Sequence, residues 1–224
     1  MQPLQRLFDS DGNEVCLFPM QDLHLTPARD PAEHDGLAMD FLGWANGVRV
    51  YDCPCYAPFS GEVVYTGNDH NMIYWSSNPV RLVDGTLSHV SILVAHSMTA
   101  PAIVGTTFVQ GQLWYHTGNY GQSTGDHLHM EVSLGHVKWN TAGTGLKDPS
   151  HIYNVMAVND TVVSRGMNYN WREYQGGVVP PSPDEKKHKF PWFMYRARIA
   201  ERTIVWQLFF FMLYIIWKEN DWNA

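Results

Sequence analysis

Short apolar runs, broken by glycine, proline, asparagine and aspartate, dominate the first 175 residues. Four of these runs read as strands: residues 61–67, 90–96, 108–115 and 129–134. Turn-forming residues between such runs are typical of an all-β domain. No long stretch of helical periodicity occurs before residue 190. The pattern therefore predicts a mainly β domain.

The segment 124–131, Thr-Gly-Asp-His-Leu-His-Met-Glu, contains two histidines separated by one residue. Positions i and i+2 of a strand point to the same side, whereas this spacing does not share a helix face. We therefore expect His127 and His129 to face one groove, which Gly125 lets the chain approach closely. One histidine can hold a metal ion while the other contacts the substrate.

The composition changes after residue 175. Residues 1–175 contain 8 basic and 17 acidic residues, whereas residues 176–224 contain 7 basic and 5 acidic ones. Residues 176–189 begin with a Gly- and Pro-rich stretch and end in a charge run, so we interpret them as a linker. The sequence thus predicts a folded domain over residues 1–175 and a separate C-terminal segment over residues 190–224.

The C-terminal segment contains a long apolar run. Ile204–Trp217 has one polar residue in fourteen. As a helix this run would be about 21 Å long, against a hydrocarbon core of about 30 Å, so it is short for a membrane span. Three interpretations stay open: a membrane anchor, a membrane-active segment, and burial against a partner or the protein's own domain. We favour burial.

Composition narrows the function classes. With 224 residues and 45% hydrophobic content, the chain can bury one sizeable core. The net charge of −7 gives no electrostatic case for a nucleic-acid partner. The N-terminus shows no basic segment followed by an apolar run, so we expect no signal peptide. Cys53 and Cys55 are spaced like a weak metal pair, but with Cys16 we interpret them as buried free thiols.

Upstream residues can complete a metal site. A catalytic zinc ion usually has three protein ligands from His, Asp or Glu and keeps one position for water. His34 and Asp40 supply an imidazole and a carboxylate, and one histidine of the His-x-His pair completes the triad. The other histidine of the pair and His96 are then free for proton transfer and oxyanion stabilisation.

These segments together resemble the ordered signature of the lysostaphin-type zinc metallopeptidases, which cleave peptidoglycan peptides. The matching elements are residues 34–40, the Val-Ala-His-Ser of residues 94–97, the Ser-Thr-Gly-x-His-x-His region of residues 121–129 and the Ala-Pro-x-x-Gly-x-Val strand of residues 57–64. The Val-Gln-Gly-Gln of residues 109–112 is similar to the family's Val-x-x-Gly turn, with the glycine one position earlier. The resemblance covers roughly residues 30–155. It implies an antiparallel β-sheet zinc peptidase domain, followed here by a hydrophobic, helical tail.

The resemblance also implies a role for each motif residue. His34, Asp40 and His129 would bind one zinc ion, while His96 and His127 would be catalytic residues outside the ligand set. His34 and Asp40 are six residues apart, whereas the family usually places this pair four apart. A tyrosine often found before the first histidine is also missing. Tyr115 and Tyr120 are the candidates to replace it.

Two further readings complete the site analysis. Residues 34–40 also resemble the related zinc D-alanyl-D-alanine peptidases, but the Glu-x-x-His that typically precedes their last ligand occurs downstream only at residues 185–188, in the predicted linker. We interpret Asp126 and Glu131 as residues that orient ligands or solvate the strand. The remaining histidines are interpreted as hydrogen-bonded structural groups: His24, His70, His89, His116, His136, His151 and His188.

The function implied by the resemblance is a zinc-dependent endopeptidase that hydrolyses peptide stems or cross-bridges of bacterial peptidoglycan. Because neither a signal peptide nor a wall-binding module is visible, we favour a lysin of a phage virion tail that opens the wall during genome entry. Residues 190–224 would then dock on phage tail proteins or contact a membrane. A free endolysin or bacterial wall hydrolase, and a non-catalytic wall-binding or structural tail protein, are the alternatives.

Overall fold

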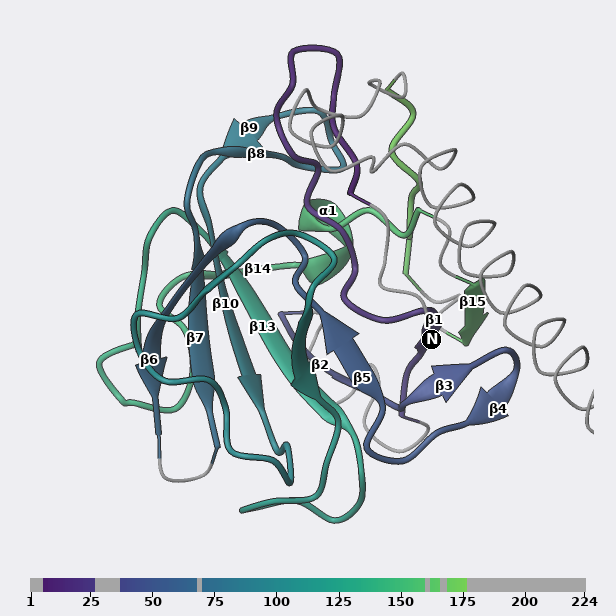
Figure 1. Cartoon of the computed structure of the whole chain (residues 1–224), viewed down its shortest axis with the longest axis vertical. Coiled ribbons are helices and arrows are strands. Elements are labelled where there is room, and N and C mark those ends of the chain that lie inside the picture. Colours follow the sequence, from purple (N-terminus) through teal and green to yellow (C-terminus); the bar gives the residue numbers. More distant parts are fainter. Residues whose placement is uncertain (1–5, 27–36, 68–69, 160–161, 166–168, 177–224) are drawn as a thin grey trace, which may run out of the picture. The chain divides into compact units, whose positions relative to one another are not determined.

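A large antiparallel sheet forms the centre of the computed structural model, which describes residues 6–26, 37–67, 70–159, 162–165 and 169–176 (Figure 1). Six of its seven strands follow the order β11–β6–β7–β10–β13–β14, and β2 also pairs with β13. The bounds are β2 (Ala38–Phe41), β6 (Gly61–Thr66), β7 (Met72–Ser76), β10 (Val90–Ala95), β11 (Thr107–Phe108), β13 (Leu128–Leu134) and β14 (Pro149–Ser150).

Smaller ribbons accompany this sheet. The antiparallel pairs are β3 (Trp44–Ala45) with β4 (Val48–Arg49), β5 (Pro54–Tyr56) with β12 (Leu113–His116), and β8 (Val80–Arg81) with β9 (Leu87–Ser88). β1 (Asp22–His24) pairs in parallel with β15 (Val162–Arg165), and α1 (Ile152–Val155) is a single helical turn. Asn46 and Gly47 join β3 to β4 with positive φ at both positions, the conformation that an Asn-Gly turn favours.

Alternate residues of β10 and β13 face opposite sides of the sheet. The side chains on the inner side are fully buried: Val90, Ile92 and Val94 in β10, and Leu128, Met130 and Val132 in β13. The alternate positions include Leu93 and His129, which lie outside this main core. A strand period of two therefore gives the sheet one face for the core and another face for polar chemistry.

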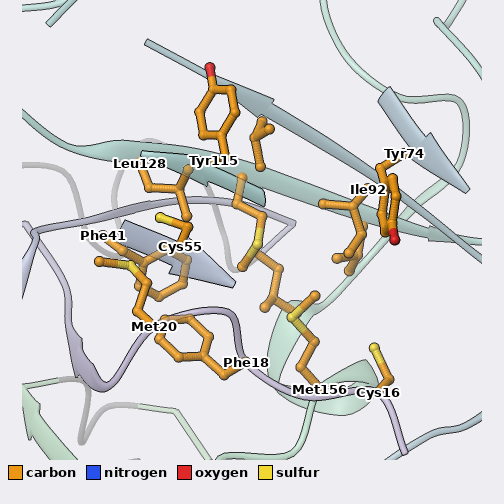
Figure 2. Close-up of a cluster of buried hydrophobic side chains, with 14 of the residues drawn as sticks. Cys16, Phe18, Met20, Phe41, Cys55, Tyr74, Ile92, Tyr115, Leu128 and Met156 are labelled. Carbon is orange, nitrogen blue, oxygen red and sulfur yellow. The ribbon is translucent and has the colours of Figure 1, made fainter. Parts of the chain in front are cut away.

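The main core lies between the large sheet and the segments that cover its inner face. Figure 2 shows Ile92 and Leu128 of the sheet together with Phe18 and Met156, which belong to covering segments. The rings of Phe18 and Phe41 meet edge to face with centroids 4.9 Å apart. Packing of these large side chains fixes the strands that carry the polar face.

The observed fold confirms the mainly β, antiparallel prediction. The expected strands at residues 61–67, 90–96 and 129–134 correspond to β6, β10 and β13. The prediction of a single strand over residues 108–115 is wrong. A turn divides it, because Gly111 has a φ of +82° and the Gln112 N–H donates to Val109 O at 3.0 Å. The two halves then pair with different strands, β11 with β6 and β12 with β5.

Two other sequence expectations concern the cysteines and the C-terminal region. The three cysteines are free and buried, as predicted, and burial raises the pKa of Cys53 to about 11. Apart from Gly176, the predicted linker at residues 176–189 and the hydrophobic segment at residues 190–224 lie outside the described residues. No helix in the described part of the chain is long and apolar enough to cross a membrane.

A buried carboxylate ties the N-terminal turn to β8. Asp9 is almost fully buried, and Arg81 Nε donates to Asp9 Oδ2 at 2.7 Å. Asn13 donates to both oxygens of Asp9, with its backbone N–H at 2.8 Å and its side-chain amide at 3.0 Å. Burial alone would raise the pKa of Asp9, but the hydrogen bonds from Asn13 and Arg81 outweigh it and hold the pKa below its usual value.

We expect this carboxylate to make folding stability depend on acid pH. Because its pKa is lower in the folded state, ionised Asp9 contributes stability above the unfolded-state pKa of about 3.9, and this stability is lost as pH falls through the folded-state pKa. Asp9→Asn should lower the free energy of unfolding at pH 7 by about 2 kcal/mol. It should also weaken the loss of stability between pH 5 and pH 2, as measured by urea unfolding.

Asp11→Asn is the matched control, since Asp11 is exposed and contacts the same arginine at 3.2 Å. An exposed ion pair contributes little, so this variant should unfold much like the wild type. Equal destabilisation by both substitutions would contradict the role of the buried carboxylate.

Candidate active site

A groove of about 550 Å³ contains most of the residues that the motifs single out. Asp40, His96, His127 and His129 all line it. The fifth predicted site residue, His34, lies outside the described residues. The structure thus brings together four of the five residues on one side of the sheet.

Strand pairing explains why these residues meet. β13 pairs with β2 on one side, where His129 lies opposite Asp40, and with β10 on the other, where His129 lies opposite Ala95. His96 directly follows Ala95. His127 is two residues before His129 and so faces the same side of the strand. Segments nearly 90 residues apart in the sequence are therefore neighbours in the groove.

Asp40 lies between the two histidines of the His-x-His pair. Its Oδ1 is 3.0 Å from His129 Nδ1 and 3.5 Å from His127 Nε2. The other ring nitrogen of His129, Nε2, is 3.3 Å from Glu131 Oε1. Burial alone would lower the pKa of His129, but its contacts with Asp40 and Glu131 outweigh burial and raise the pKa to about 9. The two carboxylates therefore stabilise positive charge at this position.

Asp40 and His129 offer donor atoms that suit zinc. In a tetrahedral site with ligand bonds of about 2.1 Å, neighbouring donors lie about 3.4 Å apart, close to the observed separation of 3.0 Å. Carboxylates commonly orient metal-binding imidazoles through the second ring nitrogen, which is the position that Glu131 occupies. Within the described ranges, no group of three His, Cys, Asp or Glu residues is arranged to hold a metal ion. The full ligand set, with His34, stays a prediction.

His96 sits at the end of β10 in an unusual backbone conformation. Its φ is +81°, which is uncommon for a residue other than glycine. Its Nδ1 donates to Tyr120 O at 2.9 Å, which leaves Nε2 for proton transfer. The rings of His96 and His127 have centroids 4.7 Å apart. Burial is the main cause that lowers the pKa of His96, and the neighbouring His127 and His129 lower it further, against the hydrogen bond to Tyr120, which raises it.

A glycine positions both proposed catalytic histidines. The Gly118 N–H donates to His127 O at 3.0 Å, and the His127 N–H donates back to Gly118 O at 2.9 Å. A Cβ atom at position 118 would lie 2.3 Å from His96 O and 2.5 Å from Met98 N. Only glycine allows this close approach. The backbones of His96 and His127 are therefore held against one segment.

Asp126 anchors the chain just before His127. Its carboxylate accepts hydrogen bonds from Thr117 Oγ1 at 2.7 Å and from the Asp52 N–H at 3.0 Å, and Arg49 Nη2 lies 3.6 Å away. Arg49 also donates to the Asp126 carbonyl oxygen. These contacts agree with the interpretation of Asp126 as an orienting residue.

The two tyrosines that could replace the missing family tyrosine, Tyr115 and Tyr120, differ in how their side chains are held. The Tyr115 hydroxyl is occupied, since it donates to His70 O at 2.6 Å and accepts from the Ser97 N–H at 3.1 Å. Tyr120 is 38% exposed, and its ring stacks on His70 with centroids 3.9 Å apart. Because its carbonyl accepts from His96, Tyr120 is the better placed of the two candidates.

Several histidines outside the groove have structural contacts. His70 Nδ1 donates to Ser97 O at 2.8 Å, and His136 Nε2 donates to Ser76 O at 2.8 Å. His89 Nδ1 lies 3.3 Å from Ser76 Oγ. These contacts agree with the structural role predicted for these three. His188 lies outside the described residues.

Sequence reasoning missed several residues of the groove. Asn71, Leu93, Trp139 and Thr144 also line it. None belongs to a recognised motif, and Leu93 reads as an ordinary strand residue. No sequence signal identifies them, because their place depends on how the strands and loops assemble.

Comparison with protein sequences identifies a phage relative. Morphogenesis protein 1 of Bacillus phage B103 is 32% identical to this chain over 174 residues. The match covers 73% of this chain and 45% of that protein, so the chain spans less than half of the relative's length. No family model matches the chain.

Comparison with solved structures finds peptidases. The catalytic domain of the antimicrobial peptidase lysostaphin from Staphylococcus simulans has a TM-score of 0.36 and 17% identity, over 58% of this chain and 84% of that chain. A zinc-containing peptidase from Vibrio cholerae has a TM-score of 0.35 and 18% identity, over 58% and 40%. The deep-sea M23 metalloprotease pseudoalterin has a TM-score of 0.33 and 13% identity, over 66% and 72%. All three of these solved structures are described as peptidases or proteases, and all have low sequence identity to this chain.

Proposed function

We propose that this protein is a zinc-dependent endopeptidase that hydrolyses peptide stems or cross-bridges of bacterial peptidoglycan. The observation that carries the proposal is the convergence of Asp40, His127 and His129 beside His96 in one groove. Four motif elements in the order of the lysostaphin-type signature support the substrate class.

In this proposal His34, Asp40 and His129 hold one zinc ion. When bound, zinc would supply Lewis-acid chemistry, because it polarises the scissile carbonyl and makes water acidic enough to react near neutral pH. His127 and His96 position the attacking water, stabilise the tetrahedral oxyanion and pass a proton to the leaving amine. The His96 Nδ1 bond to Tyr120 O leaves Nε2 of that ring for the proton transfer.

The phage context forms the second part of the proposal. The likeness to Morphogenesis protein 1 of Bacillus phage B103 supports an association with a phage. In this proposal the protein is a virion-associated lysin that opens the wall during genome entry. Residues 190–224, with the apolar run Ile204–Trp217, would provide the attachment to phage tail proteins. A free endolysin or bacterial wall hydrolase is the alternative, and detection of the protein in purified virions separates the two.

Zinc content tests the proposed ligands. Asp40→Ala and His129→Ala should each lower the zinc measured by elemental analysis and abolish release of new amino groups from purified peptidoglycan, because each removes a donor. A chelator should stop the wild-type reaction, and added zinc should restore it. His89→Ala is the control, since His89 precedes β10 at the end opposite His96. Full zinc content in both ligand variants would refute the assignment.

The two other histidines should behave as catalysts. His96→Ala and His127→Ala should keep zinc but reduce turnover by about 100-fold or more, because both remove a proton-transfer group. A variant with near wild-type cleavage of peptidoglycan would show that its histidine has no such role.

The backbone of His96 provides a second measurement. At a φ of +81°, glycine is less strained than alanine, so His96→Gly should be more stable than His96→Ala by about 1 kcal/mol in urea unfolding. Both variants should be equally inactive. Equal stability of the two would show that the conformation carries no strain.

If residues 190–224 attach the protein to the phage tail, removal of this segment should abolish attachment without abolishing peptide hydrolysis. Trp171 packs against the main core and Tyr174 against a smaller cluster, so a chain ending at Gln175 keeps both. This shortened protein should bind zinc and cleave soluble muropeptides at close to the full-length rate. Phage that encode it should lose the enzyme from purified particles. If the shortened protein unfolds, the division of the chain at residue 175 is wrong.

A further inference from the structure

We propose that Trp139 is the substrate-binding wall of the groove and determines affinity for an uncharged peptide segment beside the scissile bond. This inference rests on the proposed function and adds a residue to it. Asp40 and the three histidines of the groove lining carry the proposed chemistry, whereas Leu93 and Trp139 also line the groove and pack in the same apolar cluster. Because these two side chains take no part in the proposed chemistry, we assign Trp139 to substrate binding.

Trp139 belongs to a closed ribbon between β13 and β14. Its backbone pairs with Leu146, and the Lys147 N–H donates to Lys138 O at 2.9 Å. One step further along, the Asn140 N–H donates to Gly145 O at 2.8 Å. These backbone hydrogen bonds across the ribbon hold Trp139 in place before substrate binds.

The base of this ribbon is joined to the proposed zinc ligand. The Leu146 N–H donates to Glu131 Oε2 at 2.7 Å, and the other oxygen of Glu131 lies 3.3 Å from His129 Nε2. A Cβ atom at position 145 would lie 2.7 Å from Glu131 Oε2, so glycine allows the ribbon to reach the carboxylate. One side chain thus sets the position of Trp139 relative to His129.

One side of the Trp139 indole packs against other side chains of the protein. Its ring meets the Tyr65 ring edge to face, with centroids 5.3 Å apart, and it packs against the buried cluster of Ile73, Leu93 and Leu146. Trp139 is only half-buried and also lines the groove. One part of the indole therefore contacts the protein, and the rest is available to a ligand.

The other lining residues indicate which ligand this wall accepts. The loop 121–124 contributes Gly, Gln, Ser and Thr, and Asn71 and Thr144 add further neutral polar groups. Among the described lining residues, Asp40 is the only acid and none is Lys or Arg. Neutral polar side chains can hydrogen-bond peptide amides, and an indole packs well against small aliphatic side chains.

The rigid wall should act on binding more than on the chemical step. A preorganised aromatic side chain loses little conformational freedom when it binds, and Trp139 is not one of the proposed proton-transfer groups. Its contacts should be equally strong in the ground state and the transition state. Removal of such an interaction raises KM and leaves kcat nearly unchanged.

The test uses the zinc-loaded full chain and soluble muropeptides prepared from purified peptidoglycan. Trp139→Ala should raise KM about tenfold and change kcat by less than about twofold. Trp139→Phe should keep KM within about threefold of the wild type. Trp44→Ala is the matched control, because Trp44 is a half-buried indole that stacks on His24 outside the groove lining, and it should leave KM unchanged.

The outcomes separate this inference from the proposed function. Wild-type cleavage with an unchanged KM in Trp139→Ala, or an equal rise in KM in Trp44→Ala, overturns the role of Trp139 but does not affect the proposed endopeptidase activity. No cleavage by the zinc-loaded wild type overturns the proposed function. Calorimetric titration of muropeptides into His127→Ala, with and without Trp139→Leu, tests the wall in the absence of turnover. Leucine keeps apolar bulk against the cluster, so equal binding by these two proteins also overturns the inference.

Discussion

Pairing of β13 with β2 on one side and β10 on the other is the constraint on which the rest of the site depends. It sets His129 opposite Asp40 and places His96 just beyond Ala95. Because side chains alternate along a strand, the same pairing buries Leu128 and Met130 in the main core. Burial of the apolar side chains therefore fixes the pairing register of β13. If β13 shifted by one residue, its apolar side chains would face the groove and its histidines would face the core.

The groove combines buried carboxylates with an uncommon backbone conformation at His96. Two buried carboxylates, Asp40 and Glu131, lie on either side of the His129 ring and stabilise positive charge there. His96 adopts a positive φ, and Gly118 approaches its carbonyl more closely than any side chain would allow. Conformations of this kind carry a cost and persist where the surrounding structure determines them. Here the hydrogen bonds between Tyr120 and His96 provide that support.

The same carboxylate links the reactive part of the groove to its aromatic part. Glu131 contacts His129 with one oxygen and the ribbon of Trp139 with the other. A single side chain can therefore set the imidazole of His129, the proposed zinc ligand, and the proposed binding wall at fixed positions relative to each other. Substrate held against the ribbon would then lie at a defined place relative to the two histidines proposed as catalysts.

The sequence by itself determined the mainly β character, three of the four expected strands, and the shared face of His127 and His129, because strand periodicity is a local property. The order of the motifs also identified Asp40, His96, His127 and His129, four of the residues that meet in the groove, while His34 lies outside the described part. Only the tertiary structure decided that residues 108–115 divide between two ribbons, that Asp40 lies against His129, and that Trp139 reaches the groove. Those features depend on which strands pair and in which register, and that choice is made by contacts between segments distant in the chain.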